Sequence, residues 1–176
     1  HIDELFGTKH WRHELLENSE NNGEEEIVKL YQDRLNLVAK YVRSFDMING
    51  SNQTIYRLVF GTNSIQGLRK MKESMWKVDG QGTFTFSDRT DPFQTVLFEL
   101  KPDYNDLKKL LVNKFKGKTV TIDKIKEFIV TETAYLDSKI KTEILKPMEY
   151  ANPPEIRIES KRKRGTFPDG TIITFI

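Results

Sequence analysis

Apolar residues recur at spacings of three and four in several stretches of this chain, which predicts amphipathic helices. The longest predicted helix covers residues 24–44, and its stripe consists of Ile27, Leu30, Tyr31, Leu35, Val38 and Val42. A second helix is predicted over residues 63–78, with Ile65, Leu68, Met71 and Met75 facing inward. Near the start, Thr8 is a candidate N-cap for a short helix that places Trp11, Leu15 and Leu16 on one face.

Between these two longer helices the pattern changes to that of strands. The segments FDMIN (45–49) and TIYRLVFGT (54–62) predict two strands joined by a tight loop. The second is apolar on both faces around Leu58, Val59 and Phe60, so we expect it inside a sheet. Two strands cannot satisfy both sheet edges. The pattern of residues 1–78 is therefore typical of a fragment of an α/β domain, completed by further chain or by a second copy that exchanges strands.

A segment rich in turn residues, 79–100, predicts a linker with short strands, because Gly80, Gly82 and Pro92 surround the sequence TFTF. Residues 101–176 then predict three helices and a hairpin. The first helix is expected over 104–116, with Leu107, Leu110, Leu111 and Phe115 facing inward and Gly117 as its C-cap. The second helix is expected from a cap at Thr121, the third over 134–150, and the strands over 155–160 and 171–176. This order is that of a winged helix-turn-helix. The predicted fold class is mixed α+β, a partial α/β sheet followed by a C-terminal winged helix.

Candidate binding residues lie on the third predicted helix and on the hairpin. The outward side of the helix offers hydrogen-bond donors suited to phosphates and base edges, namely Thr133, Tyr135, Ser138, Lys139, Lys141 and Thr142. The hairpin offers clustered cations, namely Arg157, Lys161, Arg162, Lys163 and Arg164. Acidic residues such as Glu143 and Glu149 interrupt this surface, so a solvated or protein-facing hairpin is an equally open interpretation.

The net charge, the absence of cysteine and the lengths of the apolar runs limit the functions that this chain can have. The net charge is only +2, so nucleic-acid binding has to rest on local clusters of cations. The chain has no cysteine, which excludes disulfides and thiolate metal sites and suits a cytoplasmic location. No apolar run reaches the roughly 18 residues that a membrane helix needs, so we expect no membrane partner.

The sequence offers few candidate residues for catalysis or metal binding. His10 and His13 lie near acidic residues, but an exposed helix carries such pairs by chance, and we expect no metal site there. The sequence has no P-loop, nucleophile elbow or zinc-protease pattern. We therefore expect no catalytic residue in this chain, and the question of enzyme activity stays open.

The stretch YRLVFGTNSIQGLRKMKESMWKVD (56–79) resembles the three-Cys-motif partner proteins, and so do the opening HIDELFGTKHWR and the basic hairpin with GTFPDG. The resemblance implies a methyltransferase-like Rossmann domain followed by a winged helix, and a partner protein that carries the three cysteines. The family's Gly-rich loop for S-adenosylmethionine is absent here. We therefore expect no cofactor in this chain, which would be the C-terminal portion of a parent able to bind S-adenosylmethionine.

Two functions follow as expectations. In the first, the winged helix binds nucleic acid, with DNA favoured, through its third helix and basic hairpin. In the second, it is a protein-interaction module that docks the radical-type protein with the three cysteines, which the resemblance to three-Cys-motif partner proteins implies, or a second copy of the chain. An independent small enzyme is a third hypothesis, and the lack of a convergent nucleophile or metal set speaks against it.

Overall fold

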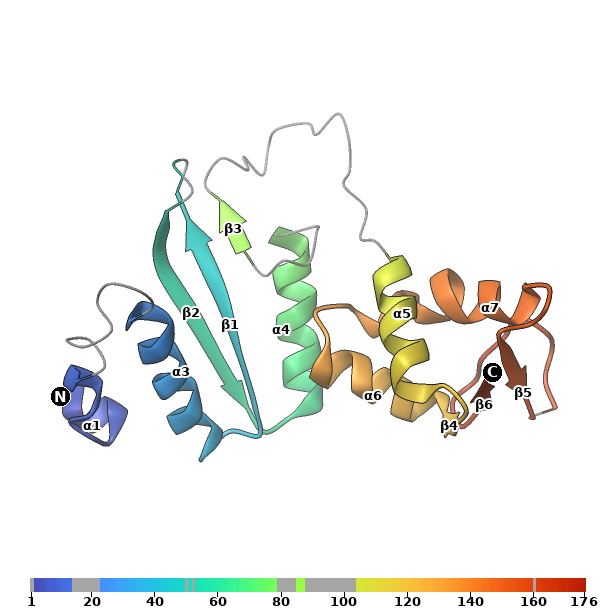
Figure 1. The fold of residues 1–176 in the computed structure, drawn as a ribbon, viewed down its shortest axis with the longest axis horizontal. Helices are drawn as coiled ribbons and strands as arrows, with labels where there is room; N and C mark the ends of the chain where they lie inside the picture. Colours follow the sequence, from blue (N-terminus) through green and yellow to red (C-terminus); the bar gives the residue numbers. More distant parts are fainter. Residues whose placement is uncertain are drawn as a thin grey trace. The chain divides into compact units, whose positions relative to one another are not determined.

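The computed structural model describes residues 2–13, 23–49, 51, 53–78, 85–87, 104–159 and 161–176. These residues divide between two compact units, the first ending at Leu68 except for a short piece around residues 86–89, and the second beginning at Arg69. Helices and two three-stranded sheets occur together, so the predicted mixed α+β class is confirmed (Figure 1).

The described residues of the first unit include two helices and a β-hairpin, and residues 11–13 are also helical. Its elements are α1 (Ile2–Phe6), α3 (Gly23–Asn36), β1 (Tyr41–Ile48) and β2 (Thr54–Thr62). β1 and β2 pair antiparallel from Tyr41 opposite Thr62, and the sheet order is β2-β1-β3, with β3 at Thr85–Ser87. The Phe6 ring lies 6.0 Å from the rings of both Trp11 and Tyr31, which joins α1 to α3.

The structure corrects two predictions in this unit. The helix predicted to reach residue 44 ends at Asn36, and Tyr41–Ile48 forms β1. Leu37 and Val38 are 74% and 73% exposed, so the apolar stripe is not a buried helical face beyond Asn36. β2 was expected inside a sheet, but β1 is its one neighbour among the described strands, and Leu58 is exposed. Leu15 and Leu16 lie outside the described residues.

Helix α4 (Ile65–Val78) begins with a side-chain cap, since the Gly67 amide donates to Ser64 Oγ at 3.3 Å. Leu68 and Met75 are buried as predicted, and Met71 is half-buried. From Arg69 onward the helix belongs to the second unit. The predicted boundary at residues 78 and 79 stays a prediction, and the predicted linker lies outside the described residues except for β3.

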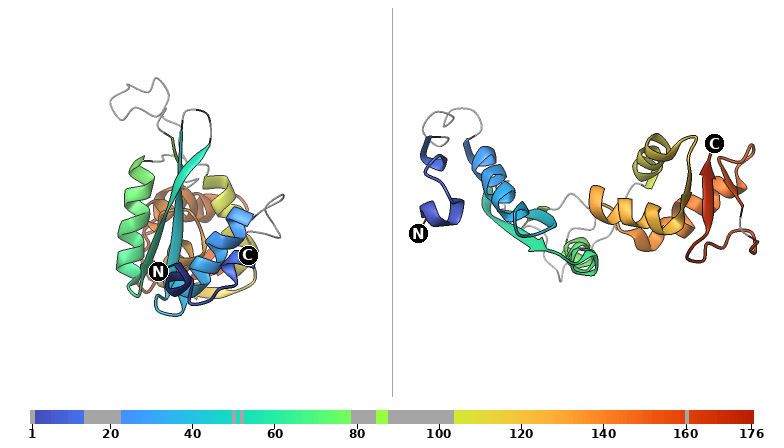
Figure 2. Two further views of the ribbon diagram at one scale, coloured as in Figure 1. Left: turned by 90° about the vertical axis from the view of Figure 1, so that its left-hand side faces the viewer. Right: turned by 90° about the horizontal axis from the view of Figure 1, so that it is seen from below.

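The second unit carries the helices and strands that the winged-helix pattern predicts. They are α5 (Tyr104–Phe115), β4 (Thr119–Thr121), α6 (Ile122–Glu132), a third helix, β5 (Ile156–Ile158) and β6 (Ile172–Phe175). The third helix runs from Asp137 to Tyr150 as a 3-10 turn (Asp137–Lys139), a π segment (Lys141–Leu145) and α7 (Lys146–Tyr150). The antiparallel sheet has the order β4-β6-β5 (Figure 1). Figure 2 gives two further views of the helices and strands of this unit, in yellow to red.

Local sequence explains the ends of these elements. Gly117 has φ +71, a conformation that glycine adopts without strain, and it follows the end of α5 as predicted. Thr121 is extended, and its side chain accepts a hydrogen bond from the Lys124 amide at 3.4 Å, which confirms it as the N-cap of α6.

One apolar core joins the three helices and the sheet. The helices contribute Leu107, Leu111, Phe115, Ile122, Ile125, Ile129, Ile140, Ile144, Leu145 and Met148, and the sheet side contributes Ile156, Phe167, Ile173 and Phe175. Leu110, predicted to face inward, is exposed. Among the described helices, none has the length and apolar character needed to cross a membrane.

Candidate nucleic-acid interface

The third helix presents a polar face opposite the buried side formed by Ile140, Ile144, Leu145 and Met148. Ser138, Lys139 and Thr142 are exposed on it, as predicted. Lys146 and Tyr150 are exposed on the same helix and were missed. Lys146 follows Thr142 by one helical turn, so continuing the polar spacing would have found it. Glu143 is exposed too, which makes the face mixed in sign.

Two of the residues predicted to face outward on the third helix instead make contacts inside the domain. Thr133 is buried, and its hydroxyl donates to the Ile129 carbonyl at 2.7 Å. The Tyr135 ring is half-buried and lies 6.2 Å from the rings of Trp76 and Tyr104. Both residues precede the third helix, which begins at Asp137 rather than at residue 134. The expectation that they point outward was therefore wrong.

The loop between β5 and β6, which we call the wing loop (residues 159–171), contains the basic run. Arg162 is internal: its guanidinium donates to Glu149 Oε1 at 2.6 Å, and the two side chains are 5% and 12% exposed. It also lies 4.6 Å from the Phe167 ring centroid. The expectation that the clustered cations of the hairpin lie at the binding surface is therefore wrong for Arg162, because a carboxylate from the third helix holds it.

Glu149 fixes a second part of the wing loop. Its Oε2 accepts from the Gly165 amide at 2.9 Å, and its backbone carbonyl accepts from Arg164 at 3.0 Å. Gly165 has φ +78, and a Cβ there would come within 3.2 Å of the Tyr150 ring. A glycine is needed because the loop backbone passes so close to the third helix.

The remaining cations of the hairpin face solvent. Lys161 and Lys163 are exposed in the wing loop, and Arg157 is exposed on β5. Arg164 is exposed, but its guanidinium lies 4.4 Å from the Tyr150 ring centroid. The basic run thus separates into anchored arginines and exposed lysines, and its lysines lie on a loop that the third helix holds in place.

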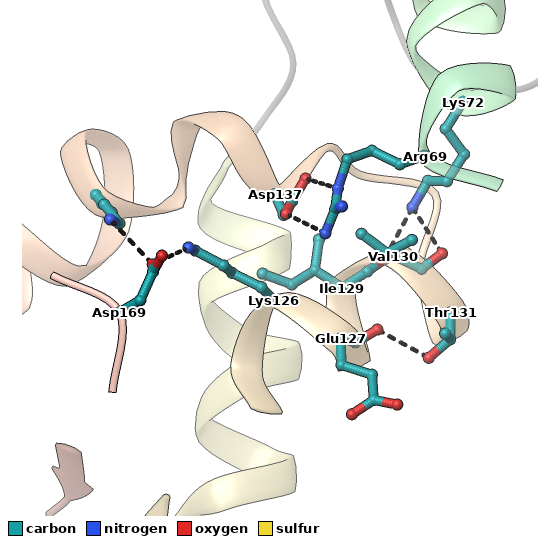
Figure 3. A network of polar contacts seen from close by, with 10 residues as sticks. Arg69, Lys72, Lys126, Glu127, Ile129, Val130, Thr131, Asp137 and Asp169 are labelled. Carbon is teal, nitrogen blue, oxygen red and sulfur yellow. Dashed lines mark hydrogen bonds and ion pairs between the residues drawn. The ribbon is translucent and has the colours of Figure 1, made fainter. Parts of the chain in front are cut away.

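Helix α4 contacts the turn between α6 and the third helix through side chains that the sequence patterns did not single out. Lys72 is 1% exposed, and its ammonium donates to the carbonyls of Ile129, Val130 and Thr133 at 2.8, 3.2 and 2.9 Å. Arg69 binds Asp137 at 3.0 Å (Figure 3). A cation at the carbonyl end of α6 complements the helix dipole, so this contact supports the turn.

An open pocket of about 410 Å³ lies beside this contact and is lined by Arg69, Glu73, Lys126, Asp137, Ser138 and Lys141. Lys126 and Lys141 lie 2.7 and 4.0 Å from Asp169 of the wing loop. The predicted residue Lys141 is therefore partly engaged within the domain. Among the described residues, no group of three or more His, Cys, Asp or Glu side chains is arranged to hold a metal ion.

Residues 85–153 match the model of a family described as the GMT-like wHTH domain. The match covers α5, β4, α6 and the third helix, and the structure adds the β5–β6 hairpin that follows. The chain therefore contains a winged helix-turn-helix domain. Neither the curated proteins nor the solved structures gave a match.

Proposed function

We propose that the winged helix binds nucleic acid, with DNA favoured, through the third helix and the wing loop. The observation that carries the proposal is the set of exposed cations on these two adjoining segments: Lys139 and Lys146 on the helix, and Lys161 and Lys163 on the loop. Mobile ammonium groups at a surface neutralise phosphates and release counterions, which favours binding. Ser138 and Thr142 add hydroxyl donors for phosphates or base edges.

A salt titration tests the proposal. Four phosphate contacts by these lysines would give a log-log slope of about −3.6 on duplex DNA, and about −2.8 on single strands. The double variant K161S/K163S should reduce the duplex slope to about −1.8. The matched control is K9S/K109S, which removes the same charge from exposed positions elsewhere and should leave the slope unchanged. No binding at low salt, or equal slopes for the two double variants, would contradict the proposal.

A second candidate function is protein interaction, and the mixed charge of the third helix favours it. Glu143 lies among the exposed lysines, and Tyr150 and Leu110 are exposed apolar groups. A partner surface with both charges would suit this face better than a uniform polyanion. Size measurement over a range of concentrations, together with the DNA titration, separates the two functions.

We also propose that the chain belongs to a larger parent protein of the family that it resembles. The resemblance of residues 56–79 to three-Cys-motif partner proteins supports a methyltransferase-like parent, S-adenosylmethionine binding in that parent, and docking of the cysteine-bearing partner. A homodimer and a cytoplasmic location belong to the same proposal. A coding sequence upstream with a Gly-rich loop after a strand would support the parent, and its absence would contradict it.

A further inference from the structure

Asp169 of the wing loop lies against two lysines from different helices. Its Oδ1 accepts from Lys126 Nζ at 2.7 Å, and Lys141 Nζ lies 4.0 Å away. Lys126 comes from α6 and Lys141 from the third helix, and both line the open pocket. Figure 3 shows Asp169 beside Lys126. Two ammonium groups thus converge on one anionic oxygen.

The two sides of this contact differ in their exposure. The Asp169 side chain is 77% exposed, whereas those of Lys126 and Lys141 are 22% and 37% exposed. The neighbouring Gly170 amide donates to Asp123 at 2.8 Å, which holds the loop near the start of α6. The lysines are therefore the more buried partners of this contact, and the carboxylate is its more exposed group.

We propose that Lys126 and Lys141 form a binding site for a backbone phosphate of the nucleic acid, and that Asp169 occupies this site in the free protein. The inference rests on the proposed function. A phosphodiester presents anionic oxygens, as a carboxylate does, so it can take the place of Asp169 between the same ammonium groups. Ser138, which lines the pocket, supplies a hydroxyl donor on that side.

The exchange is energetically reasonable because an ion pair with an exposed carboxylate contributes little to stability, and this carboxylate therefore competes only weakly with a phosphate. The Lys126 hydrogen bond and the positive charges of Lys126 and Lys141 lower the pKa of Asp169, so the competing group is an anion at neutral pH. Arg69 is not part of this exchange, because Asp137 binds it through two contacts at 3.2 and 3.0 Å.

Removing the competing carboxylate provides the test. Asp169→Asn should tighten binding of a duplex DNA probe by about two- to fivefold. Asp106→Asn is the matched control, because Asp106 is also exposed and accepts from a lysine, Lys109, at 2.9 Å. In a Lys126→Ser background, Asp169→Asn should lose most of its effect, because one of the two ammonium groups is missing.

The outcomes separate the two proposals. If the wild type binds DNA and Asp169→Asn has the same effect as Asp106→Asn, the phosphate site is refuted and the proposed function stands. An unchanged effect of Asp169→Asn in the Lys126→Ser background also refutes the site, since it indicates general electrostatics. If neither the wild type nor Asp169→Asn binds at low salt, both proposals fall.

Discussion

Glu149 gives the sharpest test of how the wing loop is built. It accepts from Arg162 at 2.6 Å and from the Gly165 amide at 2.9 Å, so Glu149→Ala removes both contacts at once. The change also removes a negative charge from a surface proposed to bind a polyanion. Electrostatics alone predicts tighter nucleic-acid binding, whereas loss of the anchored loop predicts weaker binding. The sign of the effect therefore separates the two causes.

The size of the effect follows from the burial of the pair. Removing one partner of a buried ion pair typically costs about 3–5 kcal/mol. We take the lower end, because Arg162 keeps its bond to the Lys163 carbonyl at 3.0 Å and its contact with Phe167. About 3 kcal/mol corresponds to a population of the open loop that is higher by about 150-fold.

Limited proteolysis measures loop opening without nucleic acid. Trypsin cleaves after lysine and arginine, and the wing loop contains four such sites in succession. When opening is fast relative to cleavage, the cleavage rate follows the open population. Glu149→Ala should therefore be cleaved there much faster than the wild type, at a temperature where both remain folded.

The matched control is Glu132→Ala, which removes a carboxylate from an exposed pair with Lys114 at 3.1 Å. An exposed pair contributes about 0–1 kcal/mol, so this variant should resemble the wild type. Equal cleavage rates for Glu149→Ala and Glu132→Ala would refute the anchoring role of Glu149. Tighter DNA binding by Glu149→Ala, without the same change in Glu132→Ala, would also refute it.

Three further predictions concern the stability of the second unit. Lys72→Met should lower the free energy of unfolding by about 3 kcal/mol in urea denaturation, because three buried carbonyls lose a charged donor; an unchanged midpoint would contradict this. Ile125→Ala, at a fully buried position, should cost about 2–5 kcal/mol in the same assay, and a loss below about 1 kcal/mol would be inconsistent with the core. Burial, then the charges of Glu143 and Tyr135, raises the pKa of Tyr104. The contribution of Tyr104 to stability is fully present below the unfolded pKa of about 10 and is lost as the pH rises through the folded pKa. Tyr104→Phe should therefore weaken the loss of stability at alkaline pH.

The sequence was a good guide where local pattern and packing agree. Ile122, Ile125 and Ile129 recur at helical spacing and are all buried, and Thr121 caps their helix. The prediction from sequence was wrong where one apolar pattern fits both a helix and a strand. Val42 continues the apolar stripe of α3, but it is buried in β1 because residues 41–48 pair with β2. Pairing between strands is a non-local interaction, so helical periodicity could not reveal it.

The same contrast between local patterns and non-local contacts applies to the candidate site. Exposure of Lys139 and Thr142 followed from helical spacing, whereas the burial of Arg162 depends on Glu149, which precedes it by 13 residues. Lys72 likewise reaches carbonyls 57 to 61 residues away. Long side chains can bring a charge to a distant partner, and sequence alone does not identify that partner.

The arrangement of charges explains how a chain with a net charge of only +2 could bind a polyanion. Near the third helix, cations divide into those held by carboxylates, such as Arg162 and Arg69, and those exposed, such as Lys161 and Lys163. The held arginines use their planar, multidentate geometry to fix the loop and the turn. The lysines keep flexible stems and remain available for phosphates. Two acidic residues of this surface, Glu149 and Asp137, therefore need not oppose binding, because they neutralise the structural arginines.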